Sequence, residues 1–585
     1  MIAKRVVHND TVYYQSLVGH IEDGLRLLKA YLEKKGHVAR QFCKRWQIDS
    51  ELFYKNLFLT VALHDIGKLT VEFQNNIKQD KRSHRYPHPF FGLPILGGIA
   101  FDEIEGLPLF IFAILGHHTQ LHRMIYQSGK IANRVNYEEK EIRHFVNRVV
   151  EILFNKLGFS SFCSMPALNV KWWEEMNETT ISDKFILPYV RMAKLGDYKV
   201  KSTFTYLFAI LQLCDDYSSA HFHQYIEKHS PSKTDFDSVL TNVEDFVYDL
   251  DLPKEEFKRT LFKGYSLYDF QNKLAEKAAK FSFLYAPCGR GKTEASLMWA
   301  YQVKTDMNRE RIIFALPTQV TCNAMYTRLV DDYELGEKNV GLFHGKSLIA
   351  LKDRHFQFDE EEDEQKDEID FKAHDLLRNE QFKGNVFFKP ITVTTIDHLI
   401  YAFVHGFSQA DFACGNLQNA VIIFDEVHYY EQHTLNILMR LFQILRKMDI
   451  PHLLMTGTAP QFILDEVEKN YAIVTDQEGL SFQPFILQKQ NEQTILNSDS
   501  VFESILQDYK ANKNIFVILN QVEWAQNFYS DLKEYLEFMD LEPAMILYHS
   551  RFIHRDRVKK EREIKELVRK KPCILVATQV IEISL

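Results

Sequence analysis

The spacing of apolar residues changes once along the chain, near residue 250. Before it, apolar residues recur at helical spacing, as at Leu17, Ile21, Leu25 and Leu28, and strand-like runs are scarce. From about residue 260, short apolar runs alternate with helical stretches, which is typical of a parallel α/β sheet. The pattern therefore predicts a helical N-terminal region followed by an α/β region.

The α/β region itself divides in two. In its first part we expect strands at 281–286, 311–316, 391–395, 420–424 and 452–455. A second α/β segment follows residue 480 and contains the stretches IFVILNQVEWAQ, MILYHSRF and CILVATQVIEISL. We accordingly expect three domains, at residues 1–240, 241–475 and 476–585.

Composition narrows the class of protein. The chain has 585 residues, of which 46% are hydrophobic, and no apolar run is long enough to span a bilayer. The seven cysteines form no C-x-x-C pair, and no secretory signal opens the chain, so we expect a cytoplasmic protein without a membrane partner. The net charge of -9 neither indicates nor excludes nucleic-acid binding, because a basic channel can lie in an acidic body.

A phosphate-binding loop is predicted in the stretch FSFLYAPCGRGKTEASLMWA, which starts at residue 281. An apolar strand, a glycine turn and a helix-forming segment follow one another there. Gly289 and Gly291 allow backbone N–H groups to point at phosphate oxygens. Lys292 can reach the β- and γ-phosphates, and the Thr293 hydroxyl can bind Mg²⁺. The first glycine of the usual pattern is replaced by Ala286, and a turn that binds nothing is the alternative.

Further motifs indicate ATP hydrolysis. In VIIFDEVHYY, Asp425 and Glu426 end a buried strand at the edge that faces the phosphates, where they can hold Mg²⁺ and orient the attacking water. MTGTAP places Thr456 and Thr458 after the next strand. Gln271, upstream of the loop, can read the adenine edge, although an isolated Gln there is more often a helix-surface residue.

The N-terminal region contains histidines and aspartates that suit a divalent metal site in a helical bundle. They occur as His20, VALHDIGKLTVEFQ with His64, Asp65 and Lys68, His88, LGHHTQ with His117 and His118, and LQLCDDYSSA with Asp215. An aspartate can bridge two ions while histidines hold each ion on its outer side. Two choices stay open, His84 or His88 and Asp215 or Asp216.

Together these motifs resemble known families. The histidine and aspartate set resembles HD-type metal-dependent phosphohydrolases. The order of P-loop, ALPT, TVTT, DEVH, TGTAP, LYHSRF and VATQVIEISL resembles superfamily 2 helicases with two RecA-like domains. Their combination looks like the CRISPR-associated helicase–nuclease of type I systems. The implied fold is multidomain, an all-α HD-type domain followed by two RecA-like α/β domains, the second incomplete.

The resemblance implies a single-stranded DNA nuclease and ATP-dependent 3′-to-5′ DNA translocase, which is recruited as a monomer by a guide-RNA surveillance complex. The implied metal ligands are His20, His64, Asp65, His88, His117, His118 and Asp215. Lys68 would lie beside the scissile phosphate. The implied ATP site is Gln271, Gly289, Gly291, Lys292, Thr293, Asp425 and Glu426. The ligand types suit Mn, Fe, Co or Ni in the HD domain, and ATP would bind with Mg.

Two departures from the family modify this expectation. The arginine-bearing motif expected after VATQVIEISL and the C-terminal accessory domain are missing from the sequence. We therefore expect a truncated form that is competent as a nuclease and impaired in ATP turnover. The alternative function is an HD-type nucleotide phosphohydrolase with a regulatory ATP-binding domain.

Overall fold

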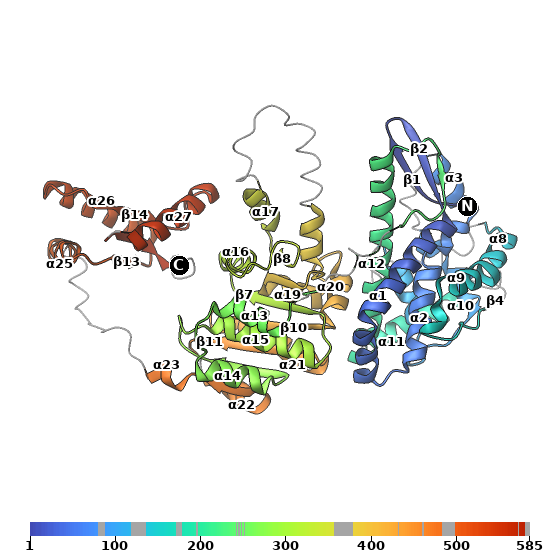
Figure 1. Ribbon diagram of the computed structural model, residues 1–585, viewed down its shortest axis with the longest axis horizontal. Coiled ribbons are helices and arrows are strands. Elements are labelled where there is room, and N and C mark those ends of the chain that lie inside the picture. The colour runs from blue at the N-terminus through green and yellow to red at the C-terminus, as the bar shows by residue number, and fades with distance from the viewer. Residues whose placement is uncertain are drawn as a thin grey trace. The chain divides into compact units, whose positions relative to one another are not determined.

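Figure 1 presents the computed structural model of the chain. The structure describes residues 1–79, 88–118, 136–170, 178–194, 197–241, 243, 246, 249–250, 252–355, 378–430, 432–458, 461–481, 498–570 and 572–579. The chain forms two compact units, Met1–Pro317 with Arg328–Asp476, and Thr318–Thr327 with Gln477–Leu585.

The N-terminal region is predominantly helical, as the apolar spacing predicts. Its core is built by α1 (Leu17–Trp46), α2 (Ser50–Leu63), α6 (Leu109–Gly116) and α12 (Tyr198–His229). Local capping fixes where the first two helices begin, because Ser16 accepts a hydrogen bond from Gly19 N at 3.0 Å and Asp49 accepts one from Leu52 N at 2.8 Å. Every residue of α6 is buried, which explains its unbroken apolar sequence.

Shorter helices complete this region. They are α3 (Val71–Lys78), α4 (His88–Phe91), α5 (Leu93–Gly97), α8 (Glu139–His144), α9 (Val150–Leu157), α10 (Glu178–Ile181) and α11 (Leu187–Lys194). The apolar spacing does not predict strands here, yet β1 (Ile2–His8) and β2 (Thr11–Ser16) form an antiparallel hairpin. Strand β5 (Asp235–Phe236) pairs with β2 in parallel, and β3 (Ile99–Ala100) pairs with β4 (Asn169–Val170). The β2–β5 and β3–β4 pairs join segments that are distant in sequence, so they leave no local signal.

A seven-stranded parallel sheet forms the core of the next region, in the order β12-β6-β11-β10-β7-β9-β8. Five strands confirm the sequence prediction within one residue, namely β6 (Phe281–Tyr285), β7 (Arg311–Leu316), β9 (Ile391–Thr395), β10 (Ala420–Phe424) and β11 (His452–Thr456). Two were not predicted, β8 (Val340–Phe343) and β12 (Ala472–Thr475). Both have four residues and occupy the sheet edges, where the apolar signal is weakest.

Helices alternate with these strands, as a parallel sheet requires. They are α13 (Lys254–Phe262), α14 (Asp269–Lys277), α15 (Lys292–Asp306), α17 (Ser347–His355), α19 (Ile396–Phe403), α20 (Ala410–Leu417), α21 (Gln432–Lys447) and α22 (Gln461–Asn470). Helix α20 also packs against α12 of the helical region, so closely that a Cβ at Gly415 would lie 2.0 Å from the Thr205 carbonyl oxygen. A buried hydrogen bond of 2.6 Å from the Tyr31 hydroxyl to Glu310 joins the same two regions.

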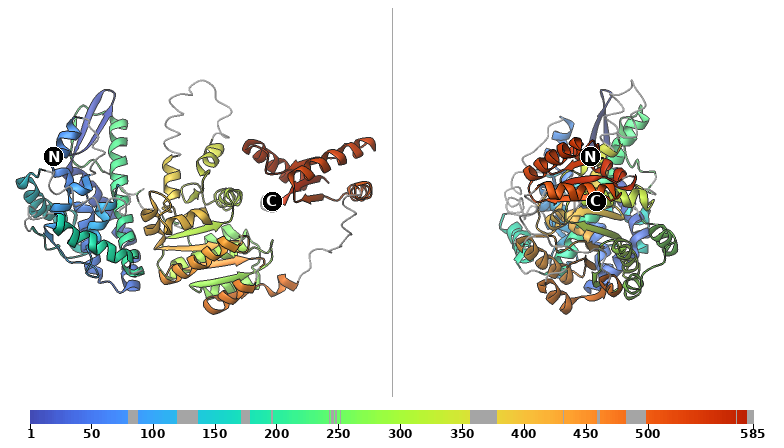
Figure 2. Two further views of the ribbon diagram at one scale, coloured as in Figure 1. Left: turned by 180° about the vertical axis from the view of Figure 1, so that it is seen from behind. Right: turned by 90° about the vertical axis from the view of Figure 1, so that its left-hand side faces the viewer.

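The second unit contains a three-stranded parallel sheet in the order β13-β15-β14. Around this sheet lie α25 (Ser498–Lys510), β13 (Ile515–Leu519), α26 (Val522–Phe538), β14 (Met545–Tyr548), α27 (His554–Lys570) and β15 (Ile574–Thr578), drawn in red in Figure 2. Helices α16 (Gln319–Thr327) and α23 (Gln477–Ser481) belong to the same unit. They confirm the second α/β segment. Residues 580–585, which carry most of VATQVIEISL, lie outside the described residues. Throughout the described part of the chain, the helices lack the length and apolar character needed to cross a bilayer.

Candidate metal centre and nucleotide site

The turn after α2 brings His64 and Asp65 to the interior of the helical region. The chain continues as a 3-10 turn, Ile66–Leu69, that packs against α4. A Cβ at Gly67 would lie 1.9 Å from the His88 carbonyl oxygen, so this close approach requires glycine. As a result, His88 Nε2 lies 2.8 Å from Asp65 Oδ1.

Asp65 stands at the centre of the site and is fully buried. Its Oδ2 atom lies 3.3 Å from His20 Nε2 and 3.4 Å from His64 Nε2, whereas its Oδ1 atom faces His88. Lys68 Nζ donates a hydrogen bond of 2.6 Å to Oδ2. Burial alone would raise the pKa of Asp65. Lys68 and the neighbouring imidazoles outweigh burial and hold this pKa well below its ordinary value. Asp65 is therefore an ionised carboxylate with each oxygen turned to a different set of histidines.

Helix α12 contributes Asp215. Its Oδ1 atom lies 3.1 Å from His20 Nε2 and 3.7 Å from His64 Nε2, and it accepts a hydrogen bond of 3.2 Å from Ser219 Oγ. The neighbouring Asp216 is exposed. Of the two aspartates left open by the sequence, the structure brings Asp215 to the cluster. Of the two histidines left open, His88 reaches it, and His84 lies outside the described residues.

Two histidines are oriented by backbone carbonyls. His64 Nδ1 donates to Val61 O at 2.8 Å, and His117 Nδ1 donates to Ile114 O at 2.5 Å. A carbonyl only accepts, so each ring carries its proton on Nδ1 when neutral and turns the Nε2 lone pair inward. Such second bonds are the usual way in which proteins orient metal-binding histidines.

Several inward-facing atoms have no hydrogen-bond partner of acceptable angle. They are the Nε2 atoms of His64, His88 and His117 and the Oδ1 atom of Asp65. Burial lowers the pKa of His20 to about 4 and those of His88 and His117 to about 3, so these rings are neutral at pH 7. Burial also acts to lower the pKa of His64, but the nearby carboxylates of Asp65 and Asp215 outweigh burial and raise that pKa. Buried polar atoms that lack partners are costly unless a further group satisfies them.

The donor atoms form two groups, His20 with His64 and Asp65, and His88 with His117 and His118. Within each group all donor atoms lie within 4.8 Å of one another. Asp65 belongs to the first group through Oδ2 and approaches the second through Oδ1. This mixed nitrogen and oxygen donor set fits two divalent cations with Asp65 between them.

The phosphate-binding loop leads from β6 into α15. Gly289 and Gly291 both have a φ of +76°, in the region that favours glycine. Lys292 opens α15, and its Nζ lies 3.5 Å from Glu426 Oε1. Thr293 follows as the second residue of that helix. The loop therefore has the backbone curl and the side-chain order that phosphate binding requires.

Sheet order brings the other motor motifs to this loop. Strands β6, β11 and β10 are neighbours, so the residues after their C-terminal ends meet at one edge. Asp425 and Glu426 follow β10, and Glu426 has a φ of +49°, which is rare for a residue other than glycine. Desolvation and the charge of Glu426 raise the pKa of Asp425 to about 7.

Gln271 braces the phosphate-binding loop. It is buried, so the alternative of a helix-surface residue is wrong. Its Oε1 atom accepts a hydrogen bond from Tyr268 N at 2.8 Å, and its Nε2 atom donates to Gly291 O at 3.0 Å. Reading of an adenine edge by Gln271 stays a prediction.

The sequence analysis gave no role to two residues that the structure brings to these sites. Lys4, from β1, places its Nζ 3.5 Å from Asp215 Oδ1, and no motif pointed to it. His428 Nδ1 lies 2.6 Å from Thr456 Oγ1, linking the ends of β10 and β11. The DEVH motif contained this histidine, and the sheet order supplies the contact.

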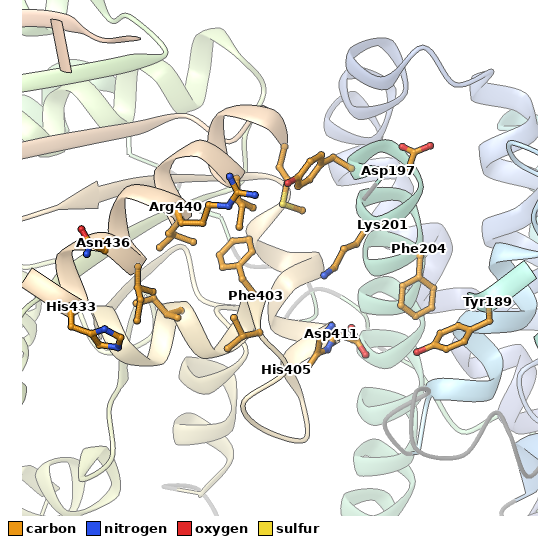
Figure 3. A pocket seen from close by; sticks show the side chains of 17 residues that line it. Tyr189, Asp197, Lys201, Phe204, Phe403, His405, Asp411, His433, Asn436 and Arg440 are labelled. Atoms are coloured by element: carbon orange, nitrogen blue, oxygen red, sulfur yellow. Dashed lines mark ion pairs between the residues drawn. The ribbon is translucent and has the colours of Figure 1, made fainter. Parts of the chain in front are cut away.

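The structure also contains a pocket of about 910 Å³. Figure 3 shows the side chains that line it. Lys201 and Phe204 of α12 line one wall, and Phe403 and Arg440 line the other. None of the predicted metal or nucleotide residues contributes to it.

Comparison with protein families identifies three parts of the chain. The model described as Cas3, HD domain matches residues 3–173, and the DEAD/DEAH box helicase model matches residues 268–466. A third model, CRISPR-associated nuclease/helicase Cas3, C-terminal, matches residues 511–585.

Relatives and solved structures agree. A putative CRISPR-associated nuclease/helicase Cas3 of Methanocaldococcus jannaschii is 45% identical over 553 residues, which cover 89% of this chain and 71% of the relative. The crystal structure of T. fusca Cas3 has a TM-score of 0.65 at 18% identity, over 99% of this chain and 69% of that one. A chain in a structure titled CRISPR RNA-guided surveillance complex, pre-nicking, has a TM-score of 0.50 at 18% identity, over 100% and 68% of the two chains. The resemblance inferred from the motifs is confirmed, and the chain belongs to the Cas3 family of CRISPR-associated nuclease/helicases.

Proposed function

We propose that the chain is a metal-dependent nuclease for single-stranded DNA that is coupled to ATP-driven 3′-to-5′ translocation in a type I CRISPR system. The observation that carries the nuclease half is the buried convergence of histidines on Asp65, with inward-facing nitrogens that lack partners. Family membership supports both halves of the proposal.

In the nuclease centre, Asp65 would help to hold both cations. His20, His64 and Asp215 would hold one cation, and His88, His117 and His118 would hold the other. Manganese, iron, cobalt or nickel suits these donors, and such ions supply positive charge that activates water and stabilises the leaving oxygen of a phosphodiester. Lys68 donates to Asp65 and keeps it ionised, and it would lie beside the scissile phosphate.

In the motor, the N–H groups of Gly289 and Gly291 receive the phosphates, and Lys292 neutralises their charge. Thr293 and Asp425 would hold Mg²⁺, and Glu426 would orient the attacking water. Gln271 fixes the loop and lies where it can recognise adenine. ATP turnover moves the strand toward the nuclease centre, so long duplexes are degraded only when both sites work.

Two partners follow from this function. The substrate strand is bound mainly through its backbone, with little sequence preference. A guide-RNA surveillance complex recruits the chain as a monomer. The fold shared with a chain in the surveillance-complex structure supports this partner.

The test uses the full chain after chelation, with Mn, Fe(II), Co, Ni or Mg restored one at a time. Circular single-stranded DNA should be cut without ATP when a fitting metal is present. Asp65→Ala should abolish the cutting and leave ATP binding intact, because the proposed ligands all precede the phosphate-binding loop. Cutting by Asp65→Ala at the normal metal-dependent rate would disprove the assignment of the centre.

Adjacent aspartates supply a matched pair of variants. Asp215→Ala removes a carboxylate that lies 3.1 Å from His20 Nε2 and should stop cleavage, whereas Asp216→Ala removes an exposed side chain and should retain most of it. Equal loss in both variants would contradict the geometry. Hydrolysis of free nucleotides in place of DNA would favour the nucleotide phosphohydrolase.

A further inference from the structure

Lys4 reaches the nuclease centre from outside every motif that defines it. The residue lies on β1, and its Nζ is 3.5 Å from Asp215 Oδ1. Its side chain is 21% exposed, whereas that of Lys68 is 4% exposed. Lys68 is therefore enclosed within the cluster, whereas Lys4 reaches from the cluster to solvent.

The backbone around Lys4 is held in place by a β-bulge and by Gln74. The β1–β2 register shifts between Ile2 and Lys4, so that β1 carries an extra residue there. Such bulges redirect side chains and are frequent beside active sites. Gln74 connects β1 to the 3-10 turn Ile66–Leu69, called the HD turn below. Its Oε1 atom accepts a hydrogen bond from Ile2 N at 3.0 Å, and its Nε2 atom donates one to Lys68 O at 2.8 Å.

The contact of Lys4 with Asp215 does not occupy all the N–H donors of its ammonium group. Asp215 Oδ1 is also contacted by His20 and Ser219. An ammonium has three N–H donors, and the contact with Asp215 uses one of them. The partly exposed Lys4 Nζ therefore lies beside the cluster with donors available to a bound anion.

We propose that Lys4 binds a non-bridging oxygen of the substrate phosphate in the nuclease centre. The inference rests on the proposed nuclease function and adds a substrate-contacting residue to it. Lys68 neutralises Asp65 from one side of the centre, and Lys4 holds the phosphate from the side of Asp215. A compact, strongly charged ammonium suits an anion of this kind.

The experiment uses the full chain loaded with manganese and the small phosphodiester bis(p-nitrophenyl) phosphate, which does not need the helicase domains. Lys4→Gln should raise KM and lower kcat/KM by about 10- to 100-fold, as expected for the loss of one charge-assisted hydrogen bond. The inhibition constant of thymidine 5′-monophosphate should rise by a similar factor, and Lys4→Arg should restore part of both. Bound manganese per chain should not change.

Lys55→Gln is the matched control, because Lys55 is also 21% exposed and lies 3.2 Å from the carboxylate of Glu51, which is not a residue of the cluster. It should behave like the unaltered chain. If Lys4→Gln loses manganese, Lys4 acts by positioning Asp215 and the proposal is wrong. If the KM and the inhibition constant of Lys4→Gln are unchanged while Asp65→Ala is inactive, the proposal for Lys4 is wrong and the nuclease assignment stands. If Asp65→Ala stays active, the nuclease assignment itself fails.

Discussion

Gly67→Ala tests whether the close packing of the HD turn holds the two histidine groups together. The added Cβ would lie 1.9 Å from the His88 carbonyl oxygen and 2.7 Å from Gly92 N. Both are backbone atoms, so no side-chain rotation relieves the clash. Contacts become ordinary at 3.4 Å, so the segment that begins at His88 must retreat by about 1.5 Å.

That displacement is large compared with the tolerance of the site. Metal–ligand distances are held within about 0.2 Å, and an error of 1 Å in a catalytic group costs about 10²-fold in rate. His88 Nε2 now lies 2.8 Å from Asp65 Oδ1, and this contact would be lost. We expect nuclease activity to fall about 100-fold or more and the second cation to be lost. Overpacking should lower the free energy of unfolding by about 1–3 kcal/mol.

The assay measures metal per chain, cleavage of circular single-stranded DNA and thermal unfolding on the same preparation. Gly36→Ala is the control, because Gly36 lies within α1 and an added Cβ there would meet only the end of the Arg40 side chain, at 3.5 Å. It should keep full activity, and helix propensity favours alanine there by roughly 1 kcal/mol. Full metal content and normal cleavage in Gly67→Ala would refute the reasoning.

Two further predictions concern the nucleotide site. Lys292→Ala should stop ATP turnover and the degradation of long duplex DNA while ATP-independent nicking persists. Lys273 is an exposed lysine of α14, so the control Lys273→Ala should change neither activity. Undiminished duplex degradation by Lys292→Ala would contradict the motor role. Asp425 has a pKa raised from 3.8 to about 7 by desolvation and Glu426, so the folded state without nucleotide loses stability as pH rises from about 4 through 7. Asp425→Asn should therefore stabilise that state more at pH 8 than at pH 5, as measured by denaturant unfolding, and an equal effect at both pH values would show that Asp425 titrates normally.

The candidate residues of both sites could be proposed from the sequence because each lies in a motif with its own local signal. The glycine turn, the Lys-Thr pair and the Asp-Glu pair after an apolar run identify a nucleotide site without knowledge of the fold. Lys4 could not be found this way. A lysine in a short polar strand has no distinguishing pattern, and its partner Asp215 is more than two hundred residues away.

The sequence by itself determined the order of domains, the five central strands and the residue types of both sites, since apolar periodicity and glycine placement act over a few residues. Only the tertiary structure chose Asp215 over Asp216 and gave each oxygen of Asp65 its own histidines. Those choices depend on which face of α12 is buried and on the contact between Gly67 and His88. Packing between distant segments decides such features, and local sequence patterns do not encode it.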